Sequence, residues 1–212
     1  MNVAEHKFLI TGGAGGIGLA LAGALAGAGG TVIICGRSLE RLQQAQSIVP
    51  ELIVRQCDIS DAEDRNALVA WIEAEHPDLC GLINNAAIQT RTDFLGSVDE
   101  AQIVAELHTN VVAPLLLSLG LLNTISRNMD GSIVNVSSGL AYCPVSSLAI
   151  YSASKAAMHS LTLSLRHQLA ARSIRVMEII PPPVDTSLGD HSAQDAIAAG
   201  LPVMTPDEFA AE

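Results

Sequence analysis

Tyr151 and Lys155 are the two side chains in this sequence best suited to proton transfer. They stand four residues apart in the run Tyr-Ser-Ala-Ser-Lys, so on a helix they project from one face, one turn apart. A free phenol has a pKa of about 10, and a neighbouring ammonium group favours the phenolate and lowers that pKa. The pair could therefore move a proton on and off an alcohol or carbonyl oxygen. Taken alone, the same spacing is also typical of a solvated helix face.

A glycine-rich segment near the start of the chain has the composition of a phosphate-binding turn. Residues 11–18 read Thr-Gly-Gly-Ala-Gly-Gly-Ile-Gly, between the apolar run 8–10 and the alanine- and leucine-rich run 19–28. A strand, a glycine turn and a helix in that order let the pyrophosphate of a dinucleotide approach bare backbone at a helix N-terminus. A flexible turn is the alternative interpretation, and the flanking strand and helix disfavour it.

Arg37 marks the end of the next apolar run, 31–35. In a dinucleotide fold, an acidic side chain about 20 residues after the glycines binds the ribose 2′-hydroxyl of NAD. No acid stands at this strand end, and an arginine there can pair with the 2′-phosphate of NADP instead. Arg37 could also be an ordinary surface cation, a less favoured alternative beside a glycine loop.

The remaining sequence alternates between strand-like and helix-like segments. We predict strands at 8–10, 31–35, 52–57, 79–83, 132–136 and 174–180, and helices at 19–28, 39–48, 61–75, 97–127 and about 151–171. Six alternations predict an α/β fold: a doubly wound parallel sheet of the Rossmann type, with three layers, α/β/α. Ligands of such sheets bind beyond the carboxyl ends of the strands. The glycine loop, Arg37, Asp58, Asn85, Ser138 and the segment 181–186 are all expected at that rim.

Composition narrows the class of protein. With 212 residues, 49% of them hydrophobic and 16% charged, the chain is expected to form one globular domain over 1–212. A formal net charge of −11 argues against a nucleic-acid partner. Neither a secretory signal nor a membrane span is predicted, because the longest apolar run, 111–122, is short and contains Pro114. We therefore expect a cytoplasmic protein without a membrane partner.

The four cysteines, Cys35, Cys57, Cys80 and Cys143, show no paired spacing. Without a secretory signal they are expected to be reduced thiols rather than disulfides or metal ligands, so no metal site is predicted.

Several motifs together resemble the classical short-chain dehydrogenase/reductase family. Thr11-Gly-x-x-x-Gly-Ile-Gly18 is similar to its cofactor loop, and Asn84-Asn85-Ala86 to the motif that steadies its central strand. Ser138 precedes Tyr151 by the family interval, and Lys155 follows it. The resemblance covers about residues 7–188. Within the family, the segments 76–79, 84–89 and 206–209 resemble the DltE-like oxidoreductases.

The resemblance implies a catalytic set of Ser138, Tyr151, Lys155 and Asn110. Tyr151 would be the general acid/base, and Lys155 would lower its pKa and hold the nicotinamide ribose. Ser138 would bind the substrate oxygen, and Asn110 would hold a water that connects Lys155 to solvent. Alternatively, Ser138 caps a turn and Asn110 is a buried polar residue bonded to backbone.

The same resemblance implies a cofactor site that extends along the whole rim. Asp58 would contact the adenine ring, and Val184 and Thr186 the nicotinamide carboxamide. The residues implied to bind the cofactor are Gly12, Ala14, Gly15, Gly16, Ile17, Gly18, Arg37, Ser38, Asp58, Ile59, Asn85, Ala86, Ala87, Tyr151, Lys155, Pro181, Val184 and Thr186.

Three features depart from the family pattern. Ala87 and Pro182 stand where glycine is usual, and we expect the added methyl of Ala87 to be tolerated. Because Pro182 fixes φ and lacks an N–H, its segment must bind the carboxamide through other groups. The chain ends at Glu212, so it is expected to lack the usual C-terminal helix and seventh strand.

Together these features predict an oxidoreductase that transfers a hydride between NADP(H), or alternatively NAD(H), and a small carbonyl or alcohol substrate of mainly apolar character. The competing hypothesis is a nucleotide-binding sensor or an inactive relative, which would not need Ser138, Tyr151 and Lys155 together. Helices 97–127 and 151–171 carry more apolar residues than one inward face needs, which predicts a homodimer or homotetramer through them.

Overall fold

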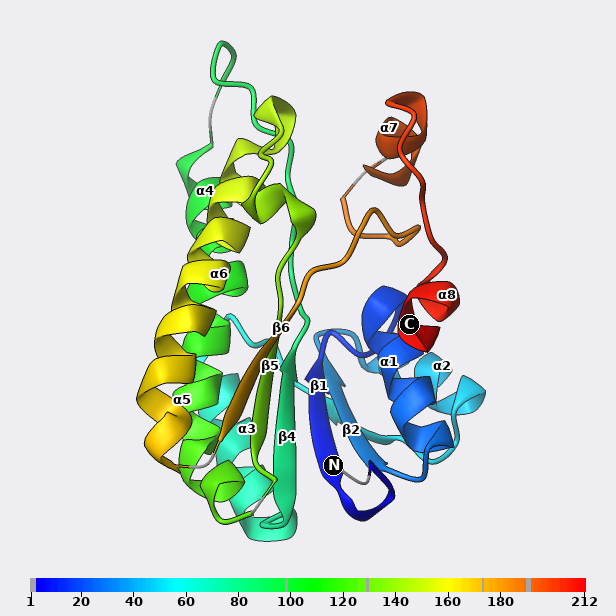
Figure 1. The fold of residues 1–212 in the computed structure, drawn as a ribbon, viewed down its shortest axis with the longest axis vertical. Helices are drawn as coiled ribbons and strands as arrows, with labels where there is room; N and C mark the ends of the chain where they lie inside the picture. Colours follow the sequence, from blue (N-terminus) through cyan, green and yellow to red (C-terminus); the bar gives the residue numbers. More distant parts are fainter. Residues whose placement is uncertain (1–2, 98, 129, 173, 190–191) are drawn as a thin grey trace.

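Six parallel strands form one twisted sheet in the order β3-β2-β1-β4-β5-β6 (Figure 1). The computed structural model describes residues 3–97, 99–128, 130–172, 174–189 and 192–212. The strands are β1 (Lys7–Thr11), β2 (Thr31–Gly36), β3 (Ile53–Gln56), β4 (Leu79–Asn84), β5 (Ser132–Val136) and β6 (Arg175–Ile179). All their carboxyl ends lie at one edge, as the predicted doubly wound arrangement requires.

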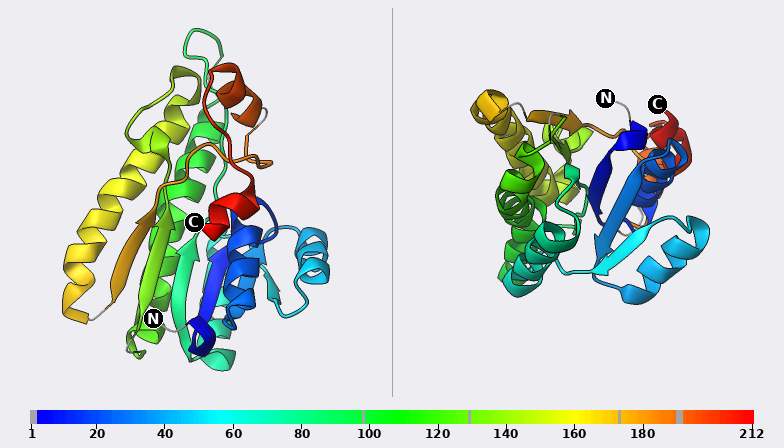
Figure 2. Two further views of the ribbon diagram at one scale, coloured as in Figure 1. Left: turned by 45° about the vertical axis from the view of Figure 1, so that its right-hand side comes forward. Right: turned by 90° about the horizontal axis from the view of Figure 1, so that it is seen from below.

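Helices cover both faces of the sheet and give the three predicted layers (Figure 2). On one face lie α1 (Gly16–Gly27) and α2 (Leu39–Ile48), which bury Ala22 and Leu42. On the other lie α3 (Ala62–Glu75), α5 (Ala113–Ser126) and α6 (Ala149–Leu169). The central strand β4 is buried at every position because both of its faces are covered.

The predicted long helix 97–127 is shorter and less regular than expected. It begins at Glu100 because the Asp99 side chain accepts from the Ala101 N–H at 2.9 Å and caps α4 (Glu100–Leu107). A π-helical turn, His108–Val112, then connects α4 to α5. Such turns often occur at functional sites. The continuous helical stretch 100–126 is long and apolar enough to cross a membrane, a property that core helices of water-soluble proteins often share. Here α5 packs against β4 and α3, and α4 packs against α6.

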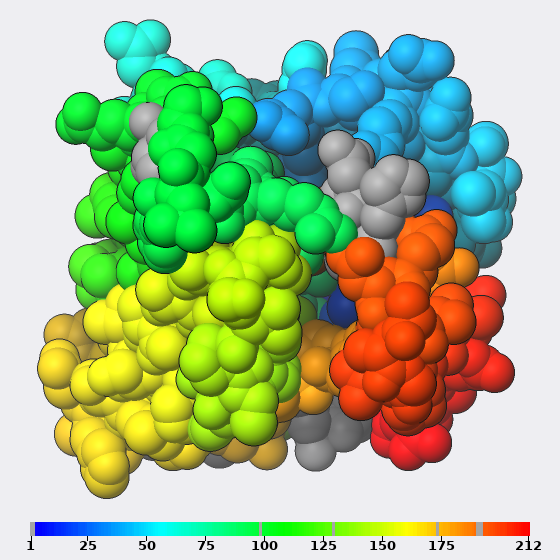
Figure 3. Space-filling view, turned by 90° about the horizontal axis from the view of Figure 1, so that it is seen from above, coloured from blue at the N-terminus to red at the C-terminus, as the bar shows by residue number. Residues whose placement is uncertain are grey.

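Two short helices in the C-terminal part were not predicted. These are α7 (Ser192–Ala198) and α8 (Pro206–Ala211), and α8 packs against α1 (Figure 2). A capping box signals the start of α8: the Thr205 hydroxyl accepts from the Glu208 N–H, and the Glu208 carboxylate accepts from the Thr205 N–H. Seen from the carboxyl edge of the sheet, the α7 segment and the loop after β4 flank a hollow (Figure 3), and Arg91 of that loop pairs with Asp195 of α7.

Candidate active site

The glycine segment forms a tight turn between β1 and α1. Gly12 and Gly16 have φ values of 67° and 53°, which favour glycine. A Cβ added at Gly18 would lie 2.4 Å from the Gly12 carbonyl oxygen and 2.5 Å from Asn85 Nδ2. Gly18 is therefore required for close packing of α1 against the turn, and it does not line the cavity described next.

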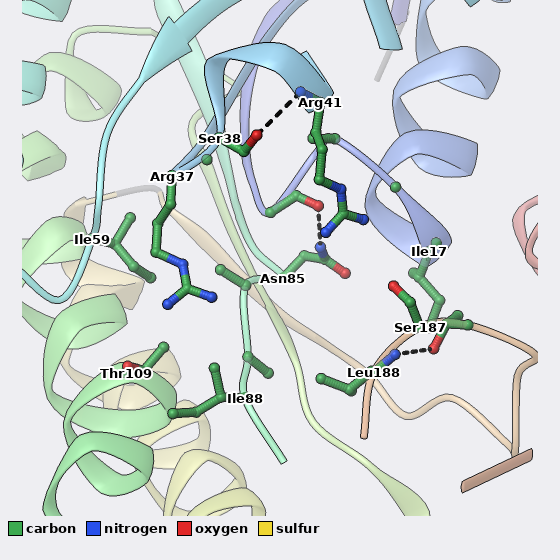
Figure 4. A pocket seen from close by; sticks show the side chains of 18 of the residues that line it. Ile17, Arg37, Ser38, Arg41, Ile59, Asn85, Ile88, Thr109, Ser187 and Leu188 are labelled. Atoms are coloured by element: carbon green, nitrogen blue, oxygen red, sulfur yellow. Dashed lines mark hydrogen bonds between the residues drawn. The ribbon is translucent and has the colours of Figure 1, made fainter. Parts of the chain in front are cut away.

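A cavity of about 470 Å³ opens at the carboxyl edge of β1, β2 and β4 (Figure 4). Most of the residues expected to bind the cofactor line it. They are Gly12, Ala14, Gly15, Gly16, Ile17, Arg37, Ser38, Asp58, Ile59, Asn85, Ala86, Ala87 and Thr186. The long axis of a dinucleotide could therefore lie along this edge, from Asp58 on one side to Thr186 on the other.

Arg37 shares the cavity with a second arginine that we did not predict, Arg41. Both guanidinium groups point into the cavity, Arg37 from the turn after β2 and Arg41 from the first turn of α2 (Figure 4). Ser38 holds this geometry, because its hydroxyl oxygen accepts from the Arg41 N–H at 3.3 Å and caps α2. Two cations beside the glycine loop make this end of the cavity suited to phosphate groups. The four-residue spacing of the arginines was the available signal.

Hydrogen bonds of Thr11 and Asn85 hold together the parts of the chain that form the floor of the cavity. The Thr11 hydroxyl oxygen accepts from the N–H groups of Asn85 and Ala86, both at 3.0 Å. The Asn85 amide donates to the Thr11 carbonyl oxygen at 2.9 Å. These bonds hold the end of β4 against the glycine turn, so the two parts of the cavity wall keep a fixed spacing.

Asp58 has a local structural task besides lining the cavity. One of its carboxylate oxygens accepts from the Ser60 N–H at 2.9 Å and from the Ser60 hydroxyl at 2.6 Å. This turn orients Asp58 and Ile59 at the end of β3, where both face the cavity.

Tyr151, Lys155 and Ser138 meet beside this cavity, although none of them lines it. Tyr151 is 5% exposed and Lys155 3% exposed, and the Ser138 side chain hydrogen-bonds the Tyr151 phenol. The Lys155 ammonium lies 5.5 Å from the centroid of the Tyr151 ring and donates to the Val136 carbonyl oxygen at 2.8 Å. Ser138 also caps a short turn, accepting from the Leu140 N–H at 3.1 Å, as the alternative interpretation expected. Its contact with a substrate oxygen stays a prediction.

The protonation of this group differs from our expectation. Burial raises the pKa of Tyr151 above its ordinary value; the hydrogen bond from Ser138 partly offsets this, and the nearby charge of Glu106 adds to it. Burial also lowers the pKa of Lys155 to about 8. The Tyr151 pKa is therefore raised where we expected Lys155 to lower it: burial is the largest influence on this phenol, and the groups that shift its pKa are Ser138 and Glu106.

Asn110 lies in the π-helical turn and is 2% exposed. Its Oδ1 accepts from the Ile88 N–H at 2.9 Å, and its Nδ2 donates to the Ile88 carbonyl oxygen at 2.8 Å and to Ser154 Oγ at 3.1 Å. The alternative role, a buried polar residue bonded to backbone, thus describes its side chain. A water held by Asn110 remains a prediction. Ile88 and Thr109 line the cavity, so Asn110 connects the cavity wall to α6.

The segment 181–186 reaches the cavity through its last residue, Thr186. Val184 forms a bridge to Met204, and the Asp185 N–H donates to the Met204 carbonyl oxygen at 2.9 Å. Thr186 approaches the glycine turn so closely that a Cβ at Gly16 would lie 3.1 Å from its methyl group. Pro181 and Val184 are buried and do not line the cavity. Ser187 and Leu188 do line it; we expected their segment, 186–204, to bind the substrate and did not count them among the cofactor residues.

Comparison with known proteins agrees with this geometry. The chain matches the short chain dehydrogenase family over residues 6–196. It is 42% identical over 193 residues to the uncharacterized oxidoreductase DltE of Bacillus subtilis, a match that covers 91% of this chain and 77% of DltE.

Solved structures with the same fold cover almost the whole chain. An NADPH-bound short chain oxidoreductase from Pseudomonas aeruginosa, with an atypical catalytic center, has a TM-score of 0.88 at 28% identity, covering 98% of this chain and 88% of that one. A short chain dehydrogenase from Burkholderia cenocepacia in complex with NADP has a TM-score of 0.84 at 27% identity, covering 100% and 83%. The chain therefore belongs to the short-chain dehydrogenase/reductase family of NAD(P)-dependent oxidoreductases, in its DltE-like branch.

Proposed function

We propose that this protein interconverts a carbonyl compound and its alcohol with NADP(H), using Tyr151 as the general acid/base. The observation that carries the proposal is the contact of Tyr151 with Ser138, one helical turn from the Lys155 ammonium and beside a dinucleotide-sized cavity. The nicotinamide would supply or accept the hydride. The protein's own groups would bind the substrate oxygen and move its proton.

The protonation states favour a division of roles at neutral pH. Tyr151 remains a phenol because burial raises its pKa, so it can donate a proton to the oxygen of a carbonyl substrate. Ser138 stands beside that phenol and can stabilise charge that develops on the same oxygen. Lys155, with a pKa of about 8, is largely protonated at pH 7 and supplies positive charge beside the ring.

We assign the cofactor preference to NADP(H), with Arg37 and Arg41 as the groups that hold the 2′-phosphate. Both side chains point into the cavity beyond the glycine loop (Figure 4), and no carboxylate occupies the end of β2. The NADPH and NADP complexes of the two solved relatives support this assignment.

The substrate is proposed to be of medium size and mainly apolar, bound between the loop 140–150 and the segment 186–204. The described residues of both stretches, 140–150, 186–189 and 192–204, stand beyond the carboxyl edge of the sheet (Figure 1), and both stretches carry more apolar than charged side chains. A cytoplasmic location is proposed because the four cysteines are free thiols.

A homodimer is proposed through α4, α5 and α6. These helices, with the π turn between α4 and α5, expose apolar side chains away from the sheet: Val104, Leu107, Val112, Leu116, Leu119 and Leu163. Helices apolar on two sides are normally buried on both. Light scattering of the intact chain at micromolar concentration should give twice the mass of a monomer. The Leu119→Arg variant should give the mass of a single monomer. A wild-type monomer would contradict the dimer.

The experiment for the catalytic proposal is a panel of carbonyls and alcohols incubated with NADPH or NADP, followed by the absorbance of the reduced nicotinamide. Turnover that Tyr151→Phe abolishes supports the proposal. The small exposed fraction of Tyr151, 5%, instead favours the second candidate, a nucleotide-binding sensor. Tight NADPH binding without turnover of any substrate would select that sensor.

A further inference from the structure

Glu106 is a carboxyl group buried in the interior of the protein, where the cost of desolvation calls for an explanation. Its side chain is fully buried on α4. One carboxyl oxygen, Oε2, accepts from the Thr90 hydroxyl. The other, Oε1, is buried and has no hydrogen-bond partner among the residues that the structure describes. Burial raises the pKa of this carboxyl, as expected for a charge removed from water.

The position of Glu106 connects it to the catalytic group. It stands one helical turn before Asn110, on the same face of the helix. Asn110 holds Ile88 and Ser154, while Glu106 holds Thr90, two residues further along the segment that follows β4. The two side chains thus fix alternate residues of this segment to one helix face.

Hydrogen bonds connect this face of the helix to α6, which carries Tyr151. The Ser154 hydroxyl, which accepts from Asn110, donates to the Tyr151 carbonyl oxygen at 2.7 Å. Two charged groups interact with Tyr151: Glu106 from α4 and Lys155 from α6. A carboxylate near the phenol disfavours the phenolate, so Glu106 adds to burial in making Tyr151 harder to ionise.

We propose that Glu106 is a positioning residue for proton transfer by Tyr151, acting from the buried space between the segment after β4 and the helix that carries the catalytic side chains. This inference rests on the proposed function, because it assigns Glu106 to the same site. Its hydrogen bond anchors Thr90, next to Ile88 and Gln89, which line the cavity. Its charge adds to burial in disfavouring the Tyr151 phenolate, so the pH at which this phenol can take up the proton of an alcohol depends on Glu106.

The charge effect can be measured without any substrate. The chain has two tyrosines, so Tyr142→Phe leaves Tyr151 as the only one. In that background, the 13C chemical shift of the labelled tyrosine Cζ follows its ionisation as pH is raised. Glu106→Gln should move the midpoint of the Tyr151 ionisation curve, or the pH at which ionisation begins, downward by roughly half a pH unit or more. Glu100→Gln, which removes an exposed charge from the same helix, should leave the curve in place.

Two further variants separate charge from packing. Glu106→Asp keeps the charge and should retain a midpoint close to that of the parent, whereas Thr90→Val removes the hydrogen bond and should leave the midpoint unchanged. If Glu106→Gln does not fold, Glu106→Leu removes the charge with an apolar side chain of similar size. Superimposable curves for the parent and the charge-removed variant at every pH where both are folded would overturn the proposal.

Kinetics provide a second readout once a substrate is known. Because alcohol oxidation needs the phenolate, Glu106→Gln should shift the acidic limb of its kcat/KM profile to lower pH. Thr90→Val should change KM without that shift. Absence of turnover in the wild-type enzyme would count against the proposed function and leave the NMR test intact. Turnover with identical pH profiles for wild type and Glu106→Gln would count against Glu106 alone.

Discussion

The side-chain amide of Asn110 hydrogen-bonds both backbone groups of Ile88, accepting at 2.9 Å and donating at 2.8 Å. It thereby joins a π-helical turn to the wall of the nucleotide cavity, and its third bond, to Ser154, reaches the helix of Tyr151 and Lys155. One side chain therefore sets the spacing between the cavity and the catalytic group.

Replacing Asn110 by alanine should destabilise the protein. Three hydrogen bonds are lost and two backbone groups of Ile88 lose their partner, which we expect to cost about 2–4 kcal/mol of unfolding free energy. Chemical denaturation measures this cost. Asn123→Ala, at an exposed position of α5, should change stability by less than about 0.5 kcal/mol. Equal effects of the two substitutions would show that the Asn110 bonds contribute nothing.

Two glycines of α1 should respond in opposite directions to a methyl group. Gly18→Ala places a Cβ 2.4 Å from a backbone oxygen of Gly12, so the glycine turn must shift and both stability and NADPH affinity should fall. At Gly27 nothing lies within 4 Å, and Gly27→Ala should raise stability by about 0.5 kcal/mol through helix propensity. Thermal unfolding with and without NADPH measures both; a neutral Gly18→Ala would contradict the packing account.

The sequence predicts those parts of the fold and the site that depend on residues close together in the chain, and not those that depend on packing between distant elements. The six strands, the sheet type and the glycine turn follow from local periodicity and were predicted. Glu106 was missed because nothing in the sequence indicates that a glutamate on a surface-like helical segment is buried. The raised pKa of Tyr151 was missed because desolvation depends on packing from several elements, whereas the spacing of Tyr151 and Lys155 shows only their attraction.

Arg41 and the helix α8 had local signals that could have been read. Arg41 follows Arg37 by one helical turn, and Thr205 with Glu208 has the spacing of a capping box. The pairing of Val184 with Met204, by contrast, joins residues 20 apart in the chain and has no local signal in the sequence.

Removing a cavity arginine should weaken NADPH binding selectively. Arg37→Ala and Arg41→Ala each delete charge-assisted bonds to a 2′-phosphate, so the Kd for NADPH should rise roughly 10- to 100-fold. The Kd for NADH should change little. Arg127→Ala, at an exposed position far along the chain from this loop, controls for net charge. Titration calorimetry with both cofactors tests this; a parallel loss of NADH affinity would exclude a role confined to the 2′-phosphate.

The buried Lys155 should make the free energy of unfolding depend on pH in the alkaline range. Its pKa is lowered to about 8 in the folded protein, below the 10.5 of a free lysine, so between those values the unfolded chain binds more protons. The free energy of unfolding should therefore rise with pH from about 8 to 10, by up to roughly 3 kcal/mol from this group. Lys155→Met should remove that rise. The same slope in wild type and variant would mean that Lys155 titrates normally.

The central claim is that the Tyr151 hydroxyl transfers the substrate proton. The most direct test compares wild type with Tyr151→Phe, measuring kcat/KM on an accepted substrate and the Kd for NADPH. We predict a loss of about 100- to 10,000-fold in kcat/KM with NADPH affinity and unfolding temperature nearly unchanged. A Tyr151→Phe enzyme that retains most of its kcat/KM would contradict the account.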